Sequence, residues 1–125
     1  MFNFAGKKPD NLGVKDGKLA PCPGTPNCVS SQSTDNQSKI DPLPPKTIAE
    51  VKQVVESMEG TKIITESDNY LYAEFKSKLM GFVDDVEFYL DTNENVIQVR
   101  SASRLGKSDL GVNRQRIEAI RAKLT

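Results

Sequence analysis

Apolar and polar side chains alternate along most of the chain between residues 62 and 103, and this alternation is the strongest constraint on the fold. Successive side chains of a β-strand point to opposite faces, so a period of two is typical of strands with one buried face. The run from Asp91 to Asn95 has the composition of a turn. The pattern predicts consecutive antiparallel strands in four segments, Lys62–Thr65, Tyr70–Ser77, Phe82–Leu90 and Val96–Ser103.

Two segments with helical spacing flank these strands. The first covers about residues 47–59 and starts with a capping-box pair, Thr47 and Glu50. The second starts at Ser108 or Asp109, either of which can cap a helix. We expect its buried stripe to contain Leu110, Ile117, Ile120 and Leu124, and its outer surface to carry Arg114, Arg116 and Arg121.

The first 45 residues lack such regularity, and all seven prolines of the chain lie within them. We expect residues 1–45 to be an irregular segment packed on a core formed by residues 46–125. A chain of 125 residues suits one domain. The predicted fold class is α+β, a four-stranded antiparallel sheet with two helices on one face and a long N-terminal wrapping coil.

The chain contains no histidine, which excludes a Ser-His-Asp triad, a Cys-His pair and a His-ligated metal. Its 17 basic and 17 acidic residues are segregated, because all five arginines lie in residues 96–125. We expect this basic segment to pair with the acidic segment 46–95. No aromatic residue interleaves the arginines, so nucleic-acid binding is not predicted. No apolar run reaches the length of a transmembrane helix.

The last two predicted strands place their polar residues by parity. Core-facing residues have even numbers in the strand Phe82–Leu90 and odd numbers in the strand Val96–Ser103. In any allowed register, the numbers of two residues that face each other across the strands therefore add up to an odd number. Glu87 or Asp85 then faces Arg100, with Arg104 nearby. One interpretation is a set of ion pairs among Asp85, Glu87 and Arg100. The other is a polar pocket in which Arg100 and Arg104 bind an anion.

The same parity puts Asp84 on the apolar face, beside Ser101 or Ser103. Adjacent carboxylates on a strand point in opposite directions, so Asp84 and Asp85 do not form one acid–base pair. A carboxylate on an apolar face needs partners. Asp84 is therefore either a structural hydrogen-bond hub or an acid that contacts a ligand. The acids Asp84, Asp85, Glu87 and Asp109 lack EF-hand spacing, and no metal is predicted.

The stretch from Arg100 to Arg114 is rich in hydrogen-bond donors and runs into a predicted helix N-terminus, a position that attracts anions. Its Gly-Lys-Ser triplet at residues 106–108 is not a P-loop, because Ser101 stands where the motif needs glycine. The predicted ligand-binding residues are Asp84, Arg100, Ser101, Ser103, Arg104, Asn113 and Arg114.

Cys22 and Cys28 are separated by five residues, which matches neither a CxxC redox motif nor a zinc pattern. A disulfide or a packed cysteine pair, a redox switch and a metal clip remain alternatives. A disulfide would indicate an oxidising compartment.

Three stretches, Asn11–Ser31 with both cysteines, Gly81–Leu90 and Val99–Arg114, together resemble the uncharacterised family called domain of unknown function 1499. The resemblance extends from about Asn11 to Leu124. It implies no established activity, substrate or cofactor. Many members are secreted, lipid-anchored or plastid-targeted, whereas this chain as it stands is expected to be cytoplasmic unless a leader has been removed.

The resemblance also implies that Asp84, Ser101, Ser103, Asn113 and the cysteine loop converge, as a ligand pocket or as a structural hub. We predict a binding or assembly module without a cofactor, whose partner is a small anion, an anionic headgroup or a protein. The alternatives are a histidine-free enzyme using Asp84 as acid or base, and a thiol-sensitive partner-binding protein using Cys22 and Cys28.

Overall fold

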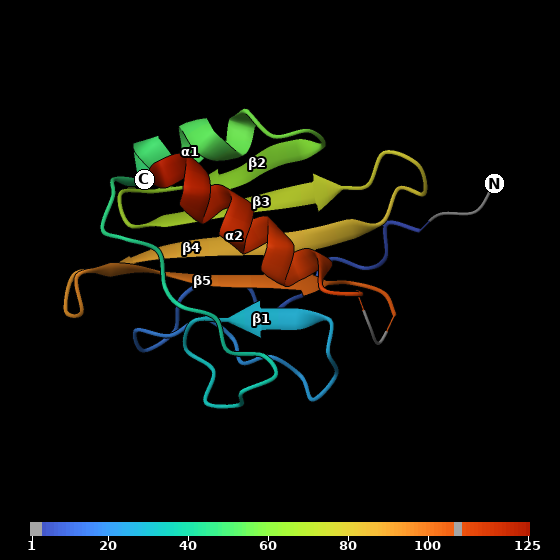
Figure 1. The fold of residues 1–125 in the computed structure, drawn as a ribbon, viewed down its shortest axis with the longest axis horizontal. Coiled ribbons are helices and arrows are strands. Elements are labelled where there is room, and N and C mark those ends of the chain that lie inside the picture. Colours follow the sequence, from blue (N-terminus) through green and yellow to red (C-terminus); the bar gives the residue numbers. More distant parts are fainter. Residues whose placement is uncertain (1–3, 107–108) are drawn as a thin grey trace.

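The computed structural model describes residues 4–106 and 109–125. Within these ranges the chain forms five strands and two helices (Figure 1). The strands are β1 (Cys28–Ser30), β2 (Thr61–Glu66), β3 (Tyr70–Lys76), β4 (Val83–Asp91) and β5 (Val96–Ser103), and the helices are α1 (Ile48–Glu56) and α2 (Val112–Leu124).

The strands of the described residues pair antiparallel in the order β1-β5-β4-β3-β2. The predicted α+β class is confirmed, but the prediction of four strands is wrong, because β1 adds a fifth at one edge of the sheet. β1 has three residues and lies inside the segment expected to be irregular. A strand this short shows no alternation. Its pairing with β5, Cys28 opposite Ala102 and Ser30 opposite Arg100, defines it instead.

One face of the sheet packs against α1 and α2, and both helices contribute to one hydrophobic core. Phe82, predicted on the core face, precedes β4 and is 40% exposed. At the start of α1, the Thr47 side chain accepts the backbone N–H of Glu50 at 3.1 Å, as the capping pattern predicts. Fully buried core residues from the two helices and the sheet include Val51, Val55, Ile117, Ile120, Leu71, Val86, Phe88, Ile97 and Val99.

Helix α2 begins at Val112, later than predicted. Leu110 and Gly111 have left-handed backbone conformations, with φ of 55° and 83°, so a right-handed helix cannot include them. The Asp109 carboxylate still accepts the backbone N–H of Gly111, at 2.8 Å. Ser108, the other predicted start, lies outside the described residues. Leu110 was predicted to be buried and is instead 91% exposed, because it stands before the helix.

The N-terminal segment covers the other face of the sheet, behind β4 and β5 in Figure 1. Gly13 donates its backbone N–H to Glu87, and Arg100 donates to the Pro21 carbonyl. The polar side chains of this face are therefore enclosed by a coil rather than by a helix. None of the helices in the described ranges is long and apolar enough to cross a membrane.

Candidate functional site

The register of β4 and β5 divides the polar residues between the two faces of the sheet. Asp84 pairs with Ser103, and Glu87 pairs with Arg100, which is one of the two predicted registers. Asp84 lies on the helix side, whereas Asp85, Glu87 and Arg100 lie on the side covered by the N-terminal coil. The predicted ligand-binding residues therefore occupy two separate places.

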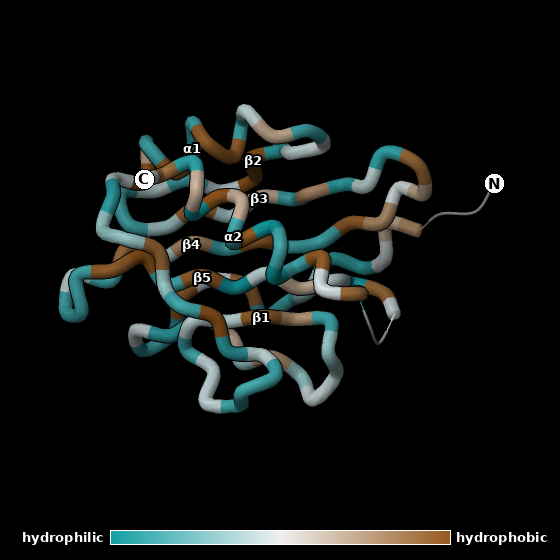
Figure 2. Tube along the Cα trace, in the orientation of Figure 1, coloured by the Kyte–Doolittle hydropathy of each residue, from teal (hydrophilic) through white to brown (hydrophobic). Residues whose placement is uncertain are grey.

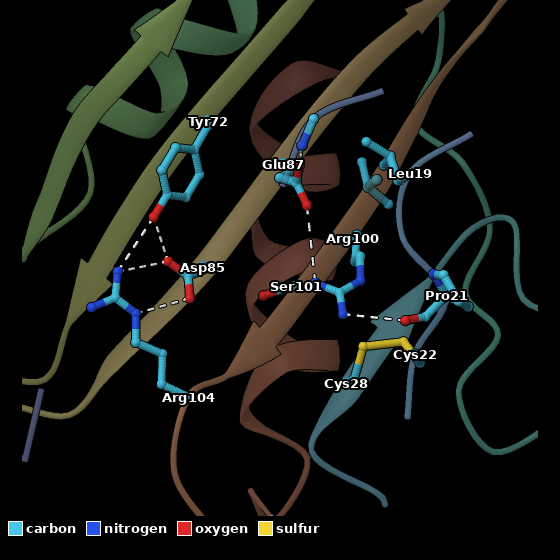
Figure 3. Close-up of polar contacts among 12 residues, drawn as sticks. Leu19, Pro21, Cys22, Cys28, Tyr72, Asp85, Glu87, Arg100, Ser101 and Arg104 are labelled. Atoms are coloured by element: carbon cyan, nitrogen blue, oxygen red, sulfur yellow. Dashed lines mark hydrogen bonds and ion pairs between the residues drawn. A yellow bond between two sulfur atoms is a disulfide. The ribbon is translucent and has the colours of Figure 1, made fainter. Parts of the chain in front are cut away.

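On the coil side, Arg104 is held by two acids. Its Nε and Nη2 atoms donate to Asp85 Oδ2 and Oδ1 at 2.9 and 2.8 Å (Figure 3). Nη2 also donates to Glu74 at 2.8 Å. Tyr72 donates its hydroxyl to Asp85 and accepts from Arg104. These hydrogen bonds, above all those to Asp85, raise the pKa of Arg104. The Arg104 head group is therefore already engaged within the protein.

Arg100 and Glu87 form a looser pair deeper under the coil. Arg100 Nη1 lies 3.9 Å from Glu87 Oε1, and Arg100 Nη2 is 3.3 Å from the Pro21 carbonyl (Figure 3). The other carboxylate oxygen of Glu87 accepts from the Tyr70 hydroxyl at 2.5 Å and from Gly13 N–H at 2.7 Å. Burial raises the pKa of Glu87 and lowers that of Arg100, because it disfavours both charged forms.

Two atoms of this pair are left without hydrogen bonds. Glu87 Oε1 and Arg100 Nε are buried and have no partner among the described residues. The side chains are 0% and 6% exposed. Buried charged groups normally satisfy their hydrogen bonds, and each exception requires an explanation. The pair thus presents one unused acceptor and one unused donor.

A cavity of about 440 Å³, here named the Arg100 cavity, opens beside this pair. Segments 7–11 and 21–23 of the coil and the ends of β4 and β5 form its walls. Among the described residues that line it, three are cationic, Lys7, Arg100 and Arg104, and one is a carboxylate, Asp85. Its lining is therefore more basic than acidic.

On the helix side, Asn113 of α2 joins three parts of the chain. Its side-chain N–H groups donate to the Asn27 carbonyl at 3.2 Å, to Ser103 at 2.9 Å and to Asp109 at 2.6 Å. Its side-chain oxygen accepts from Ser101 at 2.6 Å. Ser101, Ser103 and Asn113 thus converge with the cysteine loop, in an arrangement we name the Asn113 cluster. The cluster holds the start of α2 against β5 and the coil.

Asp84 is bound by a residue that the sequence reasoning missed. Arg116 Nη2 donates to Asp84 Oδ2 at 2.8 Å, and Arg116 Nη1 donates to Ser101 and Asn113. Arg116 also stacks over the Phe75 ring, 4.8 Å from its centroid. We expected Arg116 outside the packed stripe of the helix, but its side chain is 12% exposed. The sequence does contain a signal for this contact, because the Asp84 carboxylate lies on an apolar face of its strand and needs a cation or hydrogen-bond donor nearby.

Arg114 lies apart from both arrangements, because it donates to the Gln37 carbonyl at 3.0 Å. The structure therefore does not bring Arg114 together with Arg100 and Arg104. The four acids considered as metal ligands are likewise divided between the two faces. Across residues 4–106 and 109–125 no group of three or more Cys, Asp or Glu side chains is placed to hold a metal ion.

Of the alternatives left open for the two cysteines, the structure has the disulfide. Cys22 and Cys28 are bonded, with 5.6 Å between their Cα atoms (Figure 3). Cys28 belongs to β1, and Cys22 follows Pro21, whose carbonyl accepts from Arg100. The bond thus fixes the coil to the sheet edge beside the Arg100 cavity.

No curated protein and no solved structure matches this chain. A family match covers residues 18–124, nearly the whole chain, and includes both cysteines, β4, β5 and α2. The chain is therefore a member of the family described as protein of unknown function (DUF1499).

Proposed function

We propose that the protein is a binding module that takes a small oxyanion into the Arg100 cavity. The observation that carries this proposal is the buried Arg100 Nε, an N–H donor without a partner in the described part of the chain. A guanidinium N–H aimed at an oxyanion forms a charge-assisted hydrogen bond, which is among the stronger kinds in proteins. Arg104 is neutralised by Asp85 and Glu74, and the two other cations of the lining, Lys7 and Arg100, favour a negatively charged ligand over a neutral one.

Glu87 narrows the class of anion. Its unpartnered Oε1 requires a donor, and it lies 3.9 Å from Nη1 of Arg100. Glu87 is not among the residues that line the Arg100 cavity, so we propose that an oxyanion with its own hydroxyl group enters past Arg100, accepts from Arg100 and donates to Glu87 at the same time. Hydrogenphosphate and bicarbonate have this chemistry near neutral pH, whereas sulfate lacks the hydroxyl. We therefore assign the ligand to the hydroxyl-bearing oxyanions.

This proposal uses only some of the ligand-binding residues that the sequence predicted. Arg100 and Arg104 line the Arg100 cavity, but Ser101 and Asn113 belong to the Asn113 cluster and Arg114 lies elsewhere. Asp84 is ion-paired with Arg116, an arrangement typical of a structural carboxylate rather than of a general acid or base. An enzyme acting through Asp84 therefore has less support than a binding module.

The disulfide supports a second, thiol-dependent property of the same site. Pro21 contacts Arg100 and is adjacent to Cys22, so reduction releases the part of the coil that encloses the Arg100 cavity. We also propose that the protein works in an oxidising compartment, because disulfides persist there and are rare in reducing ones.

Calorimetric titration and thermal unfolding with hydrogenphosphate, bicarbonate and sulfate test the proposal. We expect the first two to bind more tightly than sulfate, and a saturating ligand to raise the unfolding temperature by roughly ten degrees. Arg100→Lys, which keeps the charge and removes Nε, should weaken binding. The control Arg114→Gln should not.

Binding of sulfate as tight as that of hydrogenphosphate would contradict the assignment of the class. An equal loss of anion affinity in Arg100→Lys and Arg114→Gln would contradict the placement of the ligand in the Arg100 cavity. No response to any of the three anions would contradict the proposed function itself.

A further inference from the structure

A second cavity lies on the helix side of the sheet and shares one lining residue, Ser103, with the Arg100 cavity. Its volume is about 670 Å³, and it is bounded by the connection between β3 and β4, by the connection between β5 and α2, and by the first turns of α2. Phe75, Phe82, Val83 and Val112 contribute apolar walls. Pockets for small molecules have volumes of about 300 to 1,000 Å³ and are mostly apolar.

The mouth of this cavity is unusually hydrophobic. Seven large hydrophobic residues are exposed in the described part of the chain, and six of them lie in residues 79–82, 105–106 and 109–112; three of the six, Phe82, Leu105 and Val112, line the cavity itself. Residues 79–82, 105–106 and 109–112 lie at the same end of the molecule, and these stretches include hydrophobic colour in Figure 2. Concentrated exposed apolar surface is typical of an interaction site, whereas scattered residues are not. Leu79, Met80, Phe82, Leu105, Leu110 and Val112 are the six.

A carboxylate with unused capacity lines the same cavity. Asp84 lines it together with its partner Arg116. Arg116 contacts Asp84 through Oδ2, and Oδ1 accepts no hydrogen bond from any residue within the described ranges. An ionised carboxylate can accept about four hydrogen bonds. Asp84 therefore offers an acceptor to a molecule whose apolar part lies against the walls.

We propose that this cavity binds an amphipathic molecule whose apolar chain packs against Phe75, Phe82 and Val112 and whose ammonium or hydroxyl head donates to Asp84. The lining combines apolar side chains with three carboxylates and three cations, and Asp84 is the buried carboxylate among the described lining residues. It is independent of the proposed oxyanion site, because Asp84 and Asp85 point to opposite faces of the sheet.

Three eight-carbon probes, octylammonium, octan-1-ol and octanoate, test this inference by titration followed with two-dimensional NMR. We expect octylammonium to bind at least about tenfold more tightly than octanoate, with octanol between them. The shifted resonances should lie in segments 79–84 and 105–116. Asp84→Asn should reduce the preference for octylammonium over octanoate.

The chain offers a matched control for the apolar walls. Val112 and Val14 are 44% and 38% exposed, and Val14 is the seventh exposed hydrophobic residue, outside this cavity. Val112→Ser should weaken octylammonium binding several-fold, whereas Val14→Ser should leave it unchanged. Because both substitutions are at exposed positions, this comparison does not depend on the stability of Asp84→Asn.

The head group can come from a free amphiphile or from a membrane lipid. If the protein sediments with phosphatidylethanolamine vesicles and Val112→Ser does not, the head group belongs to a membrane lipid. If the protein binds octylammonium but does not sediment with the vesicles, the head group belongs to a free amphiphile. Equal affinity of the protein for octylammonium and octanoate would overturn the inference. An equal loss of octylammonium affinity in Val112→Ser and Val14→Ser would overturn it as well. Loss of oxyanion binding in Arg100→Lys would not affect it.

Discussion

Asp84 and Asp85 are adjacent in β4 but bind arginines on opposite faces of the sheet. Asp84 Oδ2 lies 2.8 Å from Arg116 Nη2 in α2, and Asp85 Oδ1 lies 2.8 Å from Arg104 Nη2 after β5. Asp84 thus holds α2 against the sheet, and Asp85 holds the segment after β5 on the face covered by the N-terminal coil. The alternation of a strand turns one dipeptide into two separate ion pairs.

The two aspartates should differ in their effect on stability. Asp85 is 1% exposed, and Asp85→Asn removes the buried charge that pairs with Arg104 and turns one of the two acceptor atoms used by Arg104 and Tyr72 into a donor, so it should destabilise by about 3 kcal/mol. Asp84 and Arg116 are each 12% exposed, and solvent reduces the effect of Asp84→Asn to about 1 to 2 kcal/mol. Urea unfolding of both variants measures the difference. A larger loss for Asp84→Asn would contradict this interpretation.

Asn113 should be the most sensitive polar residue of α2. Asn113→Ala removes the hydrogen bonds of the Asn113 cluster and leaves buried groups of Ser101 and Asn27 with fewer partners, so we expect a loss of about 2 to 3 kcal/mol. Gln115→Ala, at an exposed position of the same helix, is the control and should change stability by less than about 0.5 kcal/mol. Similar losses in the two variants, measured by chemical denaturation, would show that the cluster does not hold the helix.

Glu87 should make stability depend on pH in the mildly acidic range. Burial raises its pKa in the folded state above the ordinary value of 4.5, so the folded protein holds this proton more tightly than the unfolded chain does. The corresponding stability is present below pH 4.5 and is lost as the pH rises through the folded-state pKa. In Glu87→Gln this side chain does not titrate, so its contribution to stability does not change with pH.

The free energy of unfolding of the wild type, relative to Glu87→Gln, should therefore decrease as the pH rises from 4 to 8. Denaturation curves at several pH values measure it, with Glu118→Gln as an exposed-acid comparison. A difference that stays constant, or that increases with pH, would show that Glu87 is not buried as described.

Reduction of the Cys22–Cys28 disulfide should destabilise the protein. A loop of this length contributes about 2 kcal/mol in the chain-entropy description. Dithiothreitol should accordingly lower the unfolding temperature by roughly 6 to 10 °C, and it should weaken oxyanion binding because Pro21 is released. A variant in which both cysteines are serine should show the lower temperature without reductant. An unchanged unfolding temperature after complete reduction, verified by thiol labelling, would contradict the prediction.

The sequence predicted the sheet face of each polar residue in β4 and β5, because Val86, Phe88, Ile97 and Val99 mark the buried side unambiguously. It left two registers open, since side-chain alternation does not define the length of the turn. The alternation within Tyr70–Ser77 likewise places Tyr70 and Tyr72 on the face opposite to Leu71, Ala73 and Phe75. That their hydroxyl groups reach Glu87 and Asp85 depends on packing across three strands.

Two parts of the structure were not predictable from local patterns. The coil before residue 46 has no periodicity, so nothing in its sequence indicates that Gly13 and Pro21 reach Glu87 and Arg100. In α2 the buried stripe was assigned from Leu110, whereas it starts at Asn113, four residues before Ile117. A polar residue in a stripe position is easily overlooked, and with it the neighbouring Arg116.

The Nε–H resonance of Arg100 provides the most direct test of the proposed oxyanion site. A two-dimensional ¹H–¹⁵N spectrum, with the resonance assigned by its loss in Arg100→Lys, should be followed during titration with hydrogenphosphate. We predict a saturable shift of the Arg100 signal, while the Nε–H signal of Arg114 stays in place. An Arg100 signal that does not move, or an equal shift of both arginines, would contradict the account.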